Sequence, residues 1–194
     1  MGFASANTIG FAGFKAKPIE VVCSSEPGLP RFEIDFLSRE AATVAQRRIS
    51  GALGSIGLSL PPRRFKVSLD PSDGITVGPF NDLAIAISIL CNIDLVDRET
   101  VSEAVIFGSL EADGIIMPGL GTLSGALVAN RFGRTLIYPA SQASELNDLV
   151  GLEAVAVSSL MELIQYFRTG RQSRNQNSRA KPVEHSAGIE DPEL

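Results

Sequence analysis

The segment from residue 81 to residue 93 constrains the fold more than any other part of the chain. Its residues Leu83, Ala84, Ile85, Ala86, Ile87, Ile89 and Leu90 are apolar, and Asn81 or Asp82 lies near its start. A surface helix carries one apolar stripe, whereas a helix that is apolar nearly all round is buried. The segment therefore predicts a central helix, which the rest of the chain has to enclose.

Alternating apolar and polar residues predict strands before this helix. Residues 19–23 and 32–36 are predicted to be two strands of a hairpin, with a turn at residues 27–30 where Gly28 supplies permissive backbone angles. Phe65, Val67 and Leu69 alternate with polar residues in a third predicted strand. A loop follows over residues 70–79, because Pro, Asp, Ser and Gly are frequent there.

A helix is predicted between the second and third of these strands, over residues 39–53. Ser38 is suited to cap its first turn. The expected buried stripe has helical spacing and consists of Ala41, Ala45, Ile49, Ala52 and Ile56. Gly54 and Gly57 are expected to end the helix.

The second half of the sequence alternates strands and helices. Strands are predicted at residues 105–110, 115–117, 135–138 and 152–157, with a hairpin at Asp113-Gly114. Helices are predicted at residues 123–132, 144–150 and 160–167. Residues 1–170 therefore form one mixed α/β domain, whereas residues 171–194 are predicted to be a disordered polar tail.

Five motifs occur in the order found in a known family. They are Gly28-Leu29-Pro30 before a strand, the Ala- and Arg-rich segment of residues 39–53, Pro61-Pro62-Arg63-Arg64 before a strand, Phe80-Asn81-Asp82-Leu83-Ala84, and Gly108-Ser109-Leu110-Glu111-Ala112-Asp113-Gly114. In this order they resemble the amino-terminal domain of the Mg-chelatase-like family that includes the competence protein ComM. The resemblance implies an α/β fold of two layers, a mixed sheet with helices, shared with Lon proteolytic domains and with a ribosomal-protein domain (ribosomal protein domain 2-like).

The resemblance also indicates where catalysis would be expected. In Lon-like proteases a Ser in the sequence Gly-Pro-Ser-Ala-Gly opens a helix, and a Lys on a later helix is its partner. This chain reads Gly78-Pro79-Phe80, so Phe80 occupies the serine position, and residues 121–125 contain no lysine. A Ser–Lys mechanism needs a hydroxyl beside a base. We therefore expect no catalytic residue and no peptidase activity.

Other chemistry lacks its residues in this sequence. Gly-Lys occurs nowhere, so the phosphate-binding loop of an ATPase is absent. His185 is the only histidine, and Cys23 and Cys91 lie far apart, which excludes the usual zinc sites. Asp70, Asp73 and Asp82 are interpreted as solvated turn and cap residues rather than metal ligands. We expect no cofactor, no metal and no membrane partner, and a cytoplasmic location.

Four arginines are the tentative nucleic-acid-binding residues: Arg47, Arg48, Arg63 and Arg64. The first two lie on the predicted first helix and the others begin the third strand, so the guanidinium groups converge if the helix packs on the sheet. Arginine suits phosphate by its bidentate geometry. The alternative interpretation is surface charges that form ion pairs with Glu40 or Glu33. The net charge of −5 opposes strong phosphate binding.

These observations lead to one functional hypothesis with three rivals. The hypothesis is a non-catalytic Lon-like module for protein interaction or self-association, accessory to a DNA-processing or AAA+ ATPase partner as the resemblance implies. The first rival is direct nucleic-acid binding through the arginines. The second is a peptidase with a relocated nucleophile, for which Ser68, Ser72 and Ser124 are the nearby hydroxyls. The third is a truncated remnant with no retained role.

Overall fold

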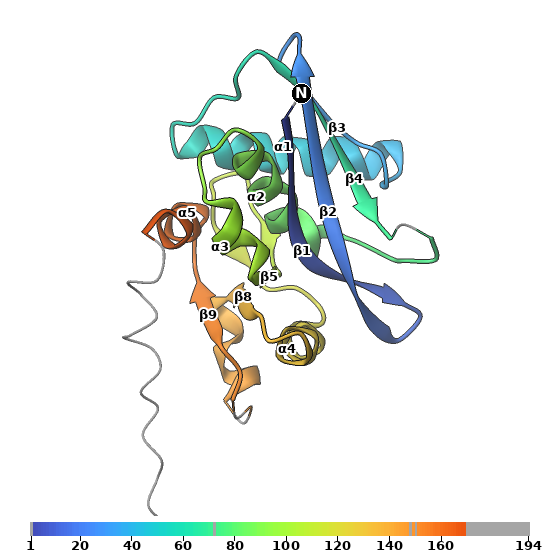
Figure 1. The fold of residues 1–194 in the computed structure, drawn as a ribbon, viewed down its shortest axis with the longest axis vertical. Coiled ribbons are helices and arrows are strands. Elements are labelled where there is room, and N and C mark those ends of the chain that lie inside the picture. Colours follow the sequence, from blue (N-terminus) through green and yellow to red (C-terminus); the bar gives the residue numbers. More distant parts are fainter. Residues whose placement is uncertain (1, 72, 148, 150, 170–194) are drawn as a thin grey trace, which may run out of the picture.

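The computed structural model describes residues 2–71, 73–147, 149 and 151–169, and one seven-stranded mixed sheet dominates it. The strands lie in the order β3-β4-β2-β1-β5-β8-β9 (Figure 1). Their bounds are β1 Gly2–Ala12, β2 Lys15–Pro27, β3 Arg31–Ile34, β4 Arg63–Asp70, β5 Ala104–Ile106, β8 Thr135–Pro139 and β9 Ala154–Val157. A small separate hairpin consists of β6, Ser109–Leu110, and β7, Ile116–Met117.

The helices are short except for the first. They are α1 Arg39–Ser55, α2 Asp82–Asn92, α3 Arg98–Ser102, α4 Thr122–Arg131 and α5 Leu160–Thr169, with 3₁₀ turns η1 Pro79–Asn81 and η2 Ala140–Leu146. The α/β class predicted from the sequence is confirmed. The predicted tail of residues 171–194 lies outside the described residues.

The antiparallel pair β1–β2 forms the centre of the sheet. The register runs from Gly2 opposite Ser25 to Ala12 opposite Lys15, and a two-residue turn joins the strands. Gly13, the first turn residue, has φ of 61°, a value that glycine adopts without strain. Antiparallel β4 extends the sheet beyond β2, and parallel β5 extends it beyond β1.

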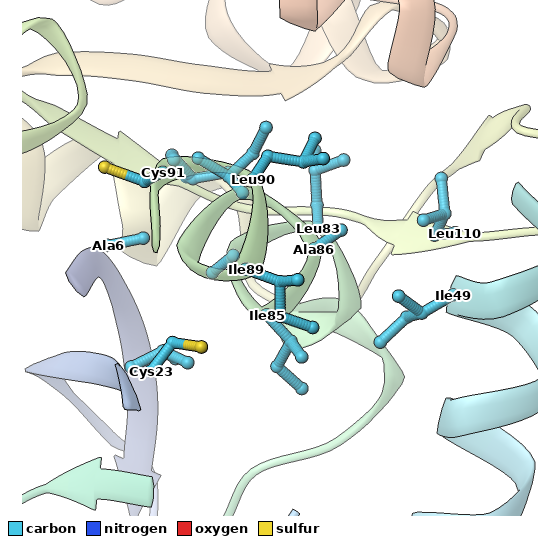
Figure 2. Packing of buried hydrophobic residues seen from close by; sticks show 14 of the residues in the cluster. Ala6, Cys23, Ile49, Leu83, Ile85, Ala86, Ile89, Leu90, Cys91 and Leu110 are labelled. Atoms are coloured by element: carbon cyan, nitrogen blue, oxygen red, sulfur yellow. The ribbon is translucent and has the colours of Figure 1, made fainter. Parts of the chain in front are cut away.

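Helix α2 is the centre of the larger hydrophobic core, as its sequence predicts. Every residue of α2 is buried, and the helix packs on β1 and β2. Figure 2 shows its Ile85 and Ile89 between Cys23 of β2 and Ile49 of α1. Helix α1 covers β3 beside it, where the amide of Gln46 donates to the carbonyl oxygen of Phe32 at 2.7 Å. The predicted cap is confirmed, because the Ser38 hydroxyl accepts from the backbone N–H of Ala41 at 3.3 Å.

A second, smaller core lies on the opposite face of β5 and β8. Val105 and Leu136 pack there with Ala126 and Ala129 of α4, whereas Ile106 and Ile137 belong to the core around α2. This half of the sheet therefore has helical cover on both faces. On β4, Phe65 and Val67 are buried while Arg64 and Lys66 are exposed, so that half has one polar face.

Several predictions of local structure are wrong in an informative way. Residues 19–23 and 32–36 do not form a hairpin, because β3 pairs in parallel with β4 and β2 pairs with β1 and β4. Strand β1 and helix α3 were not predicted. On α1 the buried residue is Ala42 and Ala41 is exposed, so the stripe begins one position later than expected.

Candidate functional site

Phe80 fills the place where the resemblance puts a serine nucleophile. Its ring lies 5.6 Å from the ring of Phe11, edge to face, and 5.6 Å from the ring of Phe107, stacked. Gly119 allows this approach, because a Cβ atom there would lie 2.9 Å from the Phe80 Cβ. The site is therefore packed with aromatic rings.

Asn81 fixes the next position in the chain. Its side-chain amide donates to the Thr8 hydroxyl at 3.1 Å and to the carbonyl oxygen of Ile9 at 2.8 Å, both on β1. Its Oδ1 atom accepts from the backbone N–H of Gly78 at 3.1 Å. These three bonds satisfy a wholly buried amide and hold the start of α2 against the centre of the sheet.

Asp82 forms a buried ion pair with Arg48, which corrects its interpretation as a solvated cap residue. Arg48 Nε lies 2.7 Å from Asp82 Oδ2, and the carboxylate side chain is 1% exposed. Burial raises the pKa of Asp82 from 3.8 to about 6, although the hydrogen bond and charge of Arg48 act in the opposite direction. Asp70 and Asp73 are exposed as expected. Over the described residues, no group of three or more His, Cys, Asp and Glu could hold a metal ion.

The four arginines do not form one cluster. Arg48 points inward to Asp82. Arg64 lies on the polar face of the sheet, away from α1, where its Nη1 atom is 3.3 Å from Oε1 of Glu26. Arg47 and Arg63 are exposed. In the described part of the chain, neither Glu40 nor Glu33 pairs with these arginines, and Glu33 pairs with Arg31 at 3.1 Å instead. The polar face further pairs Lys66 with Asp35, so its positive charges stand beside negative ones.

Helix α4 is built with its large side chains outward, which sequence reasoning missed. Its buried residues are mostly small: Thr122, Gly125, Ala126, Val128 and Ala129. Leu120, Leu123 and Leu127, here called the leucine face, are 86%, 49% and 57% exposed. The spacing of four residues places Leu123 and Leu127 on one side of the helix, and Leu120 lies just before the helix begins at Thr122. The signal was present in the sequence, because Gly and Ala at helical spacing mark the side that packs closely.

Other exposed apolar residues lie on elements that pack against the core around α2, not against the smaller core beneath α4. Ile115 and Met117 flank the buried Ile116 on the β6–β7 hairpin, and Met161 is the second residue of α5. Ile115 forms a β-bridge with Ser159, two residues before Met161. Contiguous apolar patches mark interaction sites on soluble proteins, whereas apolar residues exposed singly are normal. Within the described ranges, no helix is long and apolar enough to cross a membrane.

The comparisons with known proteins agree with the sequence motifs. Residues 19–142 match the family described as subunit ChlI of Mg-chelatase. The chain is 25% identical over 169 residues to the uncharacterized protein Rv2897c of Mycobacterium tuberculosis. This match covers 87% of the chain and 34% of the relative. It is also 24% identical over 184 residues to the uncharacterized protein YifB of Escherichia coli, and this match covers 95% of the chain and 36% of YifB. The chain thus spans about a third of the length of these relatives, and it belongs to the ChlI family of Mg-chelatase subunits.

Proposed function

We propose that this chain is a non-catalytic module of Lon-like fold that works by binding another protein chain through the leucine face. The exposed leucines on α4 and just before it carry the proposal. A helix that turns Gly and Ala inward and two leucines outward, with the exposed Leu120 just before it, exposes apolar surface that a monomer would be more stable without. A partner chain that buries this surface accounts for its exposure in the isolated chain.

The filled site opposes the rival of a relocated peptidase. Phe80 stands in an aromatic cluster where a hydroxyl is needed, and residues 121–125 contain no lysine. Ser124 lies on α4, and Ser68 lies on the polar face of β4, with no histidine on either element. A serine nucleophile needs an adjacent base to be activated.

The relatives suggest what the partner is. The family is described as a subunit of a chelatase, so its named member assembles with other chains. The relatives are about three times as long as this chain. We therefore propose that the leucine face binds a chain that supplies what the longer relatives carry in the rest of their length, an AAA+ ATPase or DNA-processing module as the sequence resemblance implies.

Reconstitution with a purified partner tests this function. Proteins that co-purify with the chain from its native host are identified, expressed and mixed with it in a binding titration. Leu123→Asp/Leu127→Asp should weaken binding at least tenfold, whereas Asn130→Asp, an exposed change on the same helix, should not. Binding that is unaffected by the double aspartate variant would refute the role of the leucine face.

Nucleic-acid binding is a separate outcome of the same measurements. Two of the four arginines are in ion pairs, so we expect only weak DNA binding. A dissociation constant below about 1 µM at physiological salt, tighter than typical non-specific binding, would favour the nucleic-acid rival if Arg63→Ala/Arg64→Ala abolished it. Casein hydrolysis, or labelling by a serine-reactive fluorophosphonate, would favour the peptidase rival.

A further inference from the structure

The two edges of the sheet differ in how they are protected. β3 is the edge strand on one side, and its residues Arg31 and Glu33 are charged and form an ion pair. β9 is the edge strand on the other side, and its sequence is Ala154-Val155-Ala156-Val157. Proteins protect exposed edges with charged residues, because an unpaired strand binds further strands through its free N–H and C=O groups. By this criterion β3 is protected and β9 is not.

The exposure of β9 comes from its outer edge. All five residues of the neighbouring β8 are buried, whereas three of the four residues of β9 are half-buried. Both faces of β9 have cover, because Val155 packs against the core around α2 while Ala154 and Ala156 pack against the smaller core. In the described part of the chain, β8 is the only strand that pairs with β9 (Figure 1). Among the described residues, no strand therefore pairs with the outer edge of β9.

We infer that β9 pairs in antiparallel orientation with β9 of a second copy of this chain, joining two sheets across a two-fold axis. This inference extends the proposed function, because it assigns self-association to a surface separate from the leucine face. Two copies of β9 can pair without bringing like charges together, because the strand has no charged residue. With Val155 opposite Val155 of the second copy, Ala154 meets Ala156 and Glu153 meets Val157, so no like charges face each other. Like charges directly opposite on paired strands are destabilising.

The local structure already accommodates the charges at the ends of the strand. Glu153 Oε2 accepts a hydrogen bond from the Thr135 hydroxyl at 3.2 Å, which holds that carboxylate toward β8. At the other end, the backbone N–H of Ser158 donates to Glu162 Oε2 at 2.8 Å, so pairing ends there. Four residues on each side make a small interface of the kind that gives weak association. We expect a dissociation constant between about 10 µM and 1 mM.

Sedimentation equilibrium of the full chain from micromolar to millimolar concentration tests the inference. The unchanged chain should shift from monomer to dimer. Ala154→Lys/Ala156→Lys adds positive charges to β9 of both copies, which repel each other. It should weaken dimerisation at least tenfold, with the fold checked by circular dichroism. The matched control is Val44→Lys, which adds a lysine to the exposed surface of α1 and should leave the dimer intact.

Amide hydrogen exchange of the unchanged chain gives a second, independent measurement. Exchange of the β9 amides should slow as protein concentration rises. A monomer at 1 mM, or β9 exchange that is slow at every concentration because another segment of the same chain occupies the edge, would overturn the inference. A dimer that Leu123→Asp/Leu127→Asp dissociates and Ala154→Lys/Ala156→Lys does not would also overturn it, while leaving the leucine face as a binding surface.

Discussion

The ion pair between Arg48 and Asp82 gives a sharp test of the energetics of the core. The perturbation is Arg48→Met, which keeps most of the apolar volume of the side chain but removes the cation. Asp82 is 1% exposed, so its carboxylate then has no compensating charge and no access to water. Removing one partner of a buried pair costs about 3–5 kcal/mol.

The effect depends on pH, and the direction follows from the pKa. Burial raises the pKa of Asp82 from 3.8 to about 6, so the folded state prefers the protonated form. The contribution of Asp82 to the free energy of unfolding therefore falls as pH rises from about 4 to about 6. The total loss is about 3 kcal/mol, because each pH unit between the unfolded and folded pKa values is worth about 1.4 kcal/mol. Loss of Arg48 raises the pKa of Asp82 further. The deficit of Arg48→Met should thus be largest at pH 8 and shrink at pH 5, where Asp82 is protonated.

Urea unfolding followed by far-ultraviolet circular dichroism measures this, since the chain has no tryptophan. At pH 8 we expect Arg48→Met to lose about 3 kcal/mol, which for a chain of this size lowers Tm by roughly 6–12 °C. Adding Asp82→Asn should recover about 2 kcal/mol or more, because it removes the unpaired charge. A loss below about 1 kcal/mol at pH 8, or an equal loss at pH 5 and pH 8, would refute the reasoning.

Three further predictions concern local features. Ser38→Ala removes the cap of α1 and should cost about 1 kcal/mol in the same urea assay, which Ser38→Asp should largely restore. Phe80→Ser should cost about 2–4 kcal/mol because the contacts with Phe11 and Phe107 are lost; it should not hydrolyse casein, since no lysine lies nearby in the sequence, and hydrolysis would contradict the filled-site argument. Deleting residues 171–194 should change the free energy of unfolding by less than about 1 kcal/mol; a larger fall in thermal melting would show that these residues dock.

The elements that sequence predicted well are those whose signal is local. Helix α1 has a capping serine and a helical stripe, and α2 is apolar all round, so each carries its own evidence. Strand β1 was missed because its residues are mostly Gly, Ala, Ser and Asn, which have weak strand preference. Its pairing with β2 over eleven residues outweighs that preference. The parallel pairing of β3 with β4 was missed for a different reason, because α1 lies between the two strands in the chain.

The candidate sites depend on contacts between distant residues, which composition and spacing do not contain. Arg48 and Asp82 are 34 residues apart, and each has an ordinary surface interpretation when it is read alone. Arg64 pairs with Glu26, 38 residues away, because β2 and β4 are neighbours in the sheet. The leucine face differs, since the inward Gly and Ala residues of α4 were visible in the sequence.

The central position of the β1–β2 hairpin sets an order for folding during synthesis. The hairpin precedes the other described strands in the chain, and its pairing needs only a two-residue turn, so it closes on the microsecond scale of about 1–10 µs. β4 then adds on one side, and β5, β8 and β9 add on the other in the order in which they are made. Each of these strands therefore meets a finished neighbour, whereas β3 is made before β4 and waits for it. Of the described strands, the unprotected β9 is the last to be made, which limits the time during which an open edge is exposed on a nascent chain.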